Sequence, residues 1–233
     1  MSMASTWQRL RRSFTASAGT IVFGMEDGTV SIFGLIFGVA ATTSNAKTVL
    51  IAGASGAVAA AVSMMAGAYL DVETTRDEAK ANRAMLEGDP TLSGAVAASL
   101  ASRLTKAGLT QTQSTALSAA VANNRAALGG LLLALQGDPD TPLNPWEQAL
   151  WMLFADFLAA AVPIMPFVFA PIPQARIISG TVTLALLIGL GIGRARIAKR
   201  GTLRTVAETV AIGIAAALAG VLIGLVIDRW FTG

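Results

Sequence analysis

"GMEDGTVSIFGLIFGVAATTSNAKTVL", residues 24–50, contains a long apolar run, a short polar turn and the start of a second apolar run. The apolar segments cover 20–43 and 48–71, and each reaches the roughly 20 residues that a helix needs to cross a bilayer. The turn "TTSNAK" between them is short and polar. This stretch therefore predicts a tight hairpin of two membrane-spanning helices.

The composition of the whole chain indicates the same class. Hydrophobic residues make up 54% of the 233 residues and charged residues only 13%, whereas about 25% of residues in soluble domains are charged. The mean hydropathy is +0.62. Three further segments are long and apolar enough to span a membrane, at 148–170, 174–193 and 205–229. We predict an all-α polytopic membrane protein with five transmembrane helices.

A polar stretch separates the second and third predicted spans and holds nearly half of the charged residues. Its amphipathic segments predict a small helical module inserted between the spans. The expected organisation is an N-terminal segment at 1–19, two spans at 20–71, the helical insertion at 72–147 and three spans at 148–233.

Lys and Arg predict the orientation, because they accumulate in cytoplasmic loops. Basic residues precede the first span and crowd the connection between the last two: Arg9, Arg11, Arg12, Arg194, Arg196, Lys199, Arg200 and Arg204. The opposite side has only Lys47, Arg176 and Arg229. We expect the N-terminus and the insertion to be cytoplasmic and the C-terminus to lie outside. Short loops and the lack of a targeting extension favour a bacterial plasma membrane.

The chain has no Cys and no His. This composition excludes disulfides, zinc–thiolate sites and cysteine nucleophiles, and it removes the commonest general base. We find no glycine fingerprint for nucleotides and no nucleophile signature, so we expect neither an enzyme nor a cofactor, and no nucleic-acid partner. An intramembrane aspartyl protease would need a catalytic pair such as Asp27 and Asp156, but neither lies in a protease motif.

Three carboxylates fall inside predicted spans. Glu26 and Asp27 lie side by side in the first, and Asp156 lies in the third, seven residues before Pro163. A charged carboxylate at the centre of a spanning helix costs about 2.5–3.5 kcal/mol, so the default interpretation is a functional site. The alternative for Glu26 and Asp27 is a position in the headgroup region, where they would only cap the helix.

The first hairpin resembles a known family. "MEDGTVSIFGLIFGVAATTSNAKTVLIAGASGAVAAAVSMMAGAYLDVETTRDEAK", residues 25–80, is similar to the opening of the vacuolar iron transporter family, which has a DG followed by an apolar stretch and later an SM-x-x-G-x-Y motif. "PIMPF", residues 163–167, resembles the proline-flanked turn of that family after its third helix. The order of five helices with an insertion after the second also matches.

The resemblance implies a homodimer that exports Fe²⁺, and often Mn²⁺, from the cytosol in exchange for protons. It places Asp27 and Met64 on an ion path between the first helices of the two subunits. A carboxylate with a thioether suits a transition metal. We expect Glu26 to assist Asp27, and Asp156 to act as a further metal ligand or proton carrier, so that Asp27 and Asp156 couple transport to protons. The alternative interpretation of Met64 is a gap-filling core residue.

The insertion departs from the family pattern. Iron-storing members carry glutamates and methionines there, whereas residues 91–137 contain no Asp, Glu or Met. Weaker metal candidates remain at Glu73, Asp77 and Glu78 in the extension of the second helix. An alternative function follows: a non-transporting membrane protein of the same fold whose cytoplasmic module binds a protein partner.

Two packing expectations complete the sequence-based predictions. Glycines four residues apart favour close helix contact, at Gly24/Gly28, Gly34/Gly38, Gly189/Gly193 and Gly220/Gly224. We also expect two copies of the insertion to pack through apolar faces around Leu100, Leu104, Leu117, Val121, Leu128 and Leu132.

Overall fold

The computed structural model of the protein describes residues 3–88, 92–122, 124, 127, 128, 131 and 144–232. All regular elements among these residues are helices. Five of them contain segments long and apolar enough to cross a membrane, at Ala18–Thr42, Ala46–Asp77, Pro145–Ile164, Ile172–Ala198 and Thr202–Phe231. The prediction of an all-α membrane protein with five spans is therefore confirmed.

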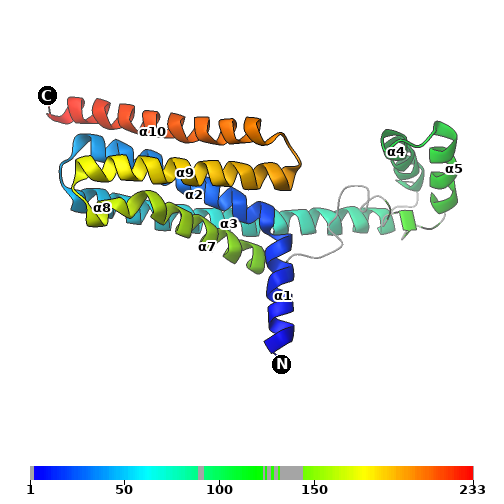
Figure 1. The fold of residues 1–233 in the computed structure, drawn as a ribbon. Coiled ribbons are helices and arrows are strands. Elements are labelled where there is room, and N and C mark those ends of the chain that lie inside the picture. The colour runs from blue at the N-terminus through cyan, green and yellow to red at the C-terminus, as the bar shows by residue number, and fades with distance from the viewer. Residues whose placement is uncertain are drawn as a thin grey trace. The chain divides into compact units, whose positions relative to one another are not determined.

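Figure 1 labels the helices in chain order, and within the bundle the connections between consecutive helices are short. Their bounds are α1 Met3–Ala16, α2 Ala18–Thr42, α3 Ala46–Gly88, α4 Leu92–Lys106, α5 Gln111–Ala122, α7 Pro145–Ile164, α8 Pro166–Phe169, α9 Ile172–Ala198 and α10 Thr202–Thr232. The chain divides into two compact units, Met1–Tyr69 with Asn144–Gly233, and Leu70–Leu143. The first unit contains the transmembrane bundle.

The third span differs from its predicted range of 148–170. α7 ends at Ile164, and the four-residue helix α8 follows it. Pro166 has no N–H group, so it cannot continue the hydrogen-bond ladder of α7. The carbonyl of Pro163 instead accepts a hydrogen bond of 2.8 Å from Ser179 Oγ in α9. The proline-rich turn thus fastens the end of α7 to the next span.

α2 has a central place in the bundle, because α7, α9 and α10 all pack on it. Figure 1 shows α2 beside α9 and α10, with α3 and α7 alongside. The buried core combines side chains from five helices: Ile32, Ile36, Ala40, Val49, Ala57, Ala160, Phe167, Ile172 and Ala175. α2 consequently has the largest buried share of the five spans, 50% of its apolar window.

Two glycine pairs bring α2 and α10 into backbone contact. A Cβ at Gly34 would lie 2.8 Å from the carbonyl oxygen of Ala216, and a Cβ at Gly38 would lie 2.6 Å from that of Gly220. Gly224 makes the same kind of approach to Gly38. The predicted close contact is therefore confirmed for these pairs, and it lies within one chain.

The other two glycine pairs differ from each other. Gly24 and Gly28 pack against α7, where a Cβ at Gly24 would meet the side chain of Met152 at 2.6 Å. Gly189 and Gly193 in α9 have no atom within 4 Å of a Cβ position, so the expectation of close contact is wrong for them within one chain. Spacing alone does not separate the two cases, because it says nothing about which helix faces the pair.

The second unit has a small core of its own. Leu100, Leu104 and Leu128 are buried together, and Val121 packs against them. The expectation that these leucines join two copies of the insertion is therefore wrong, because Leu100 and Leu104 of α4 pack against Leu128, which follows α5 in the same chain. Leu117 is 42% exposed. Leu132 lies outside the described residues.

Candidate functional site

Glu26 is buried in α2 and is bound by two other helices. Arg194 Nη1 in α9 donates to Glu26 Oε1 at 3.1 Å and to Oε2 at 3.3 Å. Thr209 Oγ1 in α10 donates to Oε1 at 2.7 Å. A buried carboxylate is stable only when its charge is paired and its lone pairs are satisfied. This ion pair therefore ties α2, α9 and α10 together inside the bundle.

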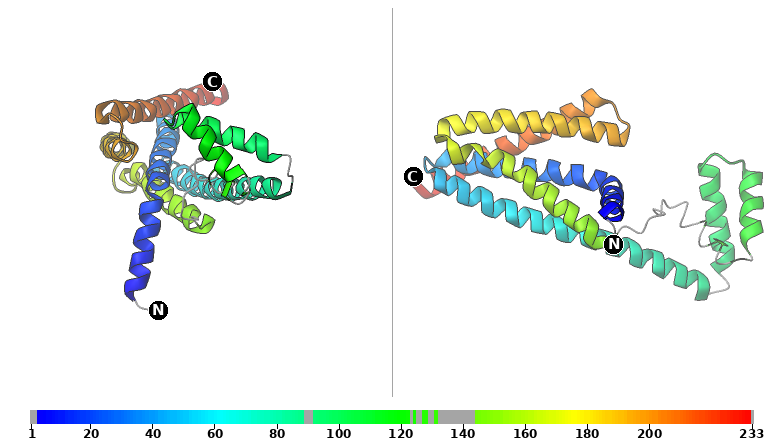
Figure 2. Two further views of the ribbon diagram at one scale, coloured as in Figure 1. Left: turned by 90° about the vertical axis from the view of Figure 1, so that its right-hand side faces the viewer. Right: turned by 60° about the horizontal axis from the view of Figure 1, so that its bottom comes forward.

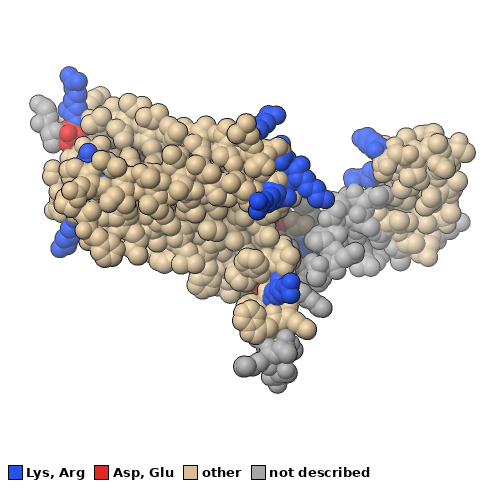
Figure 3. All heavy atoms as spheres, viewed as in Figure 1, with Lys and Arg blue, Asp and Glu red and all other residues tan. Residues whose placement is uncertain are grey.

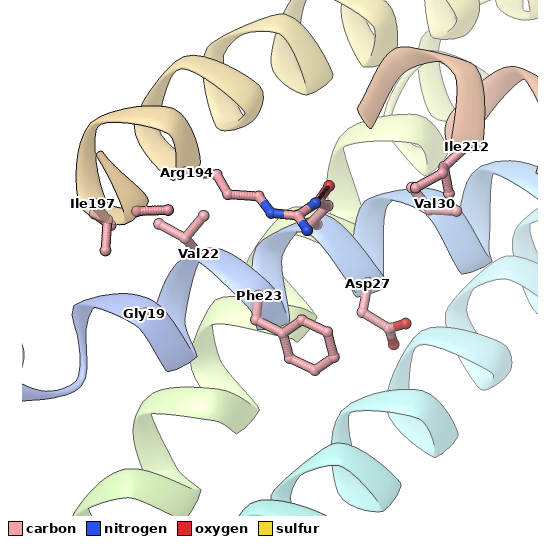
Figure 4. Close-up of a pocket in the computed structure, with 10 residues that line it drawn as sticks. Gly19, Val22, Phe23, Asp27, Val30, Arg194, Ile197 and Ile212 are labelled. Carbon is pink, nitrogen blue, oxygen red and sulfur yellow. Dashed lines mark hydrogen bonds and ion pairs between the residues drawn. The ribbon is translucent and has the colours of Figure 1, made fainter. Parts of the chain in front are cut away.

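Asp27 faces a different direction, because successive helix positions are about 100° apart. Its side chain is half-buried and lines a cavity of about 350 Å³, and the ion-paired Glu26 and Arg194 line the same cavity. Figure 4 shows the Asp27 carboxylate directed away from Arg194. Among the described residues Asp27 has no ion pair. The two neighbouring acids therefore have unequal surroundings, one paired and one open.

Asp156 is fully buried in α7. Neither of its carboxylate oxygens has a hydrogen-bond partner. The Asp156 side chain lies against Gly28, where a Cβ would collide with the Asp156 carbonyl oxygen and with Oδ1. Gly28 follows Asp27 directly in α2, so the missing side chain lets a second carboxylate approach the helix next to Asp27.

Met64 lies half-buried in α3. The depth of Met64 follows from how α2 and α3 pair: a Cβ at Gly53 would lie 3.0 Å from Ile36, and one at Gly56 would lie 3.3 Å from Ile32. Continuing this antiparallel register places Met64 within about one turn, or 5 Å, of the level of Asp27 along the helix axis. The tertiary structure thus brings the predicted carboxylate and thioether to a common depth.

The described residues of one chain do not form a complete metal shell. Over the described ranges, no group of three or more acidic side chains converges as a metal site would require. The three membrane carboxylates gather around one segment of α2, but Glu26 is already ion-paired and Asp156 is enclosed between α2 and α7. The open ligands are therefore few.

The weaker candidates belong to the other unit. Glu73 is half-buried in α3 and Asp77 is exposed there. Asp77 has an interaction partner. The side chain of Glu78 lies outside the described part of the chain. All three residues belong to the second unit, Leu70–Leu143, and not to the unit that contains the transmembrane bundle.

Sequence reasoning missed the partners of Glu26. In the sequence Arg194 indicates only the orientation of the spans, and Thr209 gives no signal, since threonine is common in spanning helices. Arg194 and Thr209 lie 168 and 183 residues beyond Glu26 in the chain. One available signal was the position of Arg194 four residues before the end of α9, within reach of the bundle interior.

Comparison with known proteins identifies a family. A family model described as the VIT family matches residues 18–225, which include the first four spans and most of the fifth, Thr202–Phe231. A protein of Centaurea cyanus named vacuolar iron transporter is 26% identical over 174 residues, which cover 72% of this chain and 71% of that protein.

Proposed function

The chain belongs to the VIT family, and from this premise we propose that it transports divalent transition-metal ions across the membrane, Fe²⁺ first and Mn²⁺ as well. The similarity to a protein named vacuolar iron transporter supports the choice of iron. We further propose that the ion leaves the cytosol in exchange for protons. The sequence resemblance in the first hairpin is confirmed at the level of the family.

One observation carries the proposal: two acidic side chains lie within spanning helices without a cationic partner among the described residues. Asp27 lines the cavity and Asp156 is buried with both oxygens unbonded. Intramembrane acids are costly, and those that persist line ion or proton paths. Packing alone would favour an apolar residue at either position. A cation or a proton is the partner that these groups lack.

The proposed ion ligands are Asp27 and Met64. A carboxylate binds hard divalent ions, and a thioether adds preference for softer transition metals over Mg²⁺ or Ca²⁺. Since one chain presents so few open ligands, a second copy of the chain would complete the shell. Phe23, Ser31 and Leu35 are exposed on α2 at four-residue intervals around Asp27, and they offer a face for a homodimer.

Proton exchange would use the same acids. Asp27 holds the metal ion when it is ionised, and its protonation from the outer side releases the ion. Asp156, which lies against Gly28, would take up or return the proton on the other side of α2. The inward return of the proton then resets the site. This cycle gives export when the N-terminus and the insertion are cytoplasmic, as the distribution of Lys and Arg favours.

Glu26 has a different part in this proposal. Arg194 and Thr209 already occupy its oxygens, so metal binding by Glu26 would first require the release of Arg194. We therefore assign to Glu26 the support of Asp27: it fixes the rotation of α2 so that Asp27 faces the cavity.

The deciding experiment is metal uptake into vesicles that contain the purified protein and a pH gradient. We expect Fe²⁺ transport by the unaltered protein and none above protein-free vesicles for Asp27→Asn, which keeps the side-chain volume and removes the charge. Glu208→Gln is the matched control, because Glu208 is an acid of α10 that pairs with Arg204 at the helix surface. Near-normal transport by Asp27→Asn would refute the assignment.

The alternative function has one observation in its favour. Residues 91–137 contain no Asp, Glu or Met, so this part of the insertion offers no carboxylate or thioether to a metal ion. A non-transporting protein whose module binds a partner would show no metal uptake in the same vesicles, with or without the pH gradient.

A further inference from the structure

The N-terminal helix α1 does not continue the line of α2. Figure 1 and the left view of Figure 2 both show α1 running across the direction of the bundle helices. Ser17 is the only residue between α1 and α2. It is buried, and α1 packs on both α2 and α7. The turn therefore belongs to the packed bundle.

Trp151 of α7 holds the end of α1. Its ring makes an edge-on contact with Phe14, with centroids 5.3 Å apart and planes at 76°. Trp151 Nε1 also donates to Ser13 Oγ at 3.0 Å. Trp151 lies six residues after Pro145, the first residue of α7, which is about 9 Å into that helix. The Phe14 side chain therefore lies beside the part of α7 that runs into the membrane.

An apolar stripe follows Phe14 along α1. Leu10 and Trp7 precede Phe14 by four and seven residues, so the three side chains share one helix face. Their exposed fractions are 72% for Trp7, 51% for Leu10 and 49% for Phe14. Phe14 contacts α7, so the stripe lies on the side of α1 that faces the membrane. No described residue of the chain covers this stripe fully.

The same end of the bundle is basic. α1 contains Arg9, Arg11 and Arg12. The end of α9 and the start of α10, which lie at this end too, supply Arg194, Arg196, Lys199, Arg200 and Arg204. Figure 3 shows Lys and Arg over this end of the bundle and on α1. Of the acids there, Glu26 and Glu208 are paired with Arg194 and Arg204. A surplus of positive charge remains.

We propose that α1 is an interfacial helix that binds the anionic phospholipid surface of the membrane in which the protein lies. Trp7, Leu10 and Phe14 enter the boundary between headgroups and acyl chains, and the arginines contact lipid phosphates. Interfacial helices have this combination of an apolar face with Trp or Phe and a basic polar face. Juxtamembrane arginines are attracted by anionic lipids. This inference concerns lipid contact and does not depend on the proposed transport.

The absence of cysteine from the chain allows a direct test. Leu10→Cys on the stripe and Gln8→Cys off the stripe each receive a spin label in the full-length protein, reconstituted in vesicles of phosphatidylcholine with phosphatidylglycerol. Both positions are exposed, so folding is expected to survive. We expect the label at position 10 to be reached by oxygen more than by a water-soluble nickel chelate, and the label at position 8 to show the reverse.

The dependence of chelate access on lipid composition tests the role of the positive charge on α1. Removing phosphatidylglycerol, or replacing Arg9, Arg11 and Arg12 by Gln, should raise the access of the nickel chelate to position 10 at least several-fold. Equal and high access of the chelate to both labels in every lipid mixture would overturn the proposal. Spin–spin broadening at position 10 that depends on protein concentration would also overturn it, because a second copy of the chain would then cover the stripe.

Discussion

Glu26 and Asp27 are adjacent acids in one helix, yet the structure gives them opposite surroundings. Glu26 has an arginine and a threonine on its oxygens, whereas Asp27 has no ion pair and Asp156, beyond Gly28, no hydrogen-bond partner among the residues that the structure describes. A paired acid stabilises helix packing, and an unpaired acid is available to a mobile cation. The difference teaches that the role of an intramembrane carboxylate depends on its partners more than on its depth.

The largest expected effect comes from neutralising Asp156, whose carboxylate has no hydrogen-bond partner among the described residues. We expect Asp156→Asn to lower proton-driven Fe²⁺ uptake toward the level of Asp27→Asn, since both substitutions remove a group that takes up a proton. The free energy of unfolding should change by no more than about 1 kcal/mol, because the replaced carboxylate has no hydrogen bond to lose. Uptake assays with thermal melts in detergent measure both quantities. Normal uptake by Asp156→Asn would remove this residue from the proton path.

A second effect concerns the approach of Asp156 to α2. Gly28→Ala should destabilise the protein by about 1–3 kcal/mol, as overpacking does, because the new Cβ collides with backbone and carboxylate atoms of Asp156. Gly193→Ala is the matched control: its Cβ meets nothing within 4 Å, so it should be neutral or stabilising by up to about 1 kcal/mol from helix propensity. The melting temperatures of the two variants test this prediction. Equal shifts would mean that α2 and α7 do not pack this closely.

Removing either partner of the Glu26–Arg194 ion pair should lower the free energy of unfolding, but by different amounts. Arg194→Gln leaves a carboxylate that is only 11% exposed without its cation, whereas Glu26→Gln leaves a guanidinium that is 39% exposed and can reach water. Removing one partner of a fully buried pair costs about 3–5 kcal/mol. We expect about 2 kcal/mol for Arg194→Gln in this partly exposed pair and about 1 kcal/mol or less for Glu26→Gln. Denaturation of the two variants side by side measures the difference, and the reverse order would show that Glu26 is not held as described.

The mildest substitution in side-chain shape is Met64→Leu. This swap conserves volume and should cost under about 1.5 kcal/mol. We expect it to weaken Fe²⁺ or Mn²⁺ transport more than it weakens stability, because leucine lacks the thioether that favours transition metals. Met65→Leu, next to it in α3, is the control. Parallel losses in melting temperature and transport for Met64→Leu would identify Met64 as a packing residue only.

The insertion could be described only in part from the sequence. Its helical character followed from amphipathic segments, but the partners of its leucines did not. Leu100 and Leu104 are covered by the chain's own Leu128, Val121 and neighbours, whereas the sequence pattern was equally compatible with a contact between copies. Periodicity identifies an apolar face and leaves open what covers it.

The sequence by itself determined the membrane class, the five spans and the hairpin turns, because the length of an apolar run and the position of prolines and polar turns are local properties. Only the tertiary structure decided which acid is neutralised and which is open. Arg194 and Thr209 reach Glu26 across 168 and 183 residues, and Asp156 reaches the side of Gly28 from another span. The rotation of α2 between its neighbours selects these contacts, and helix rotation depends on the packing of all the spans together.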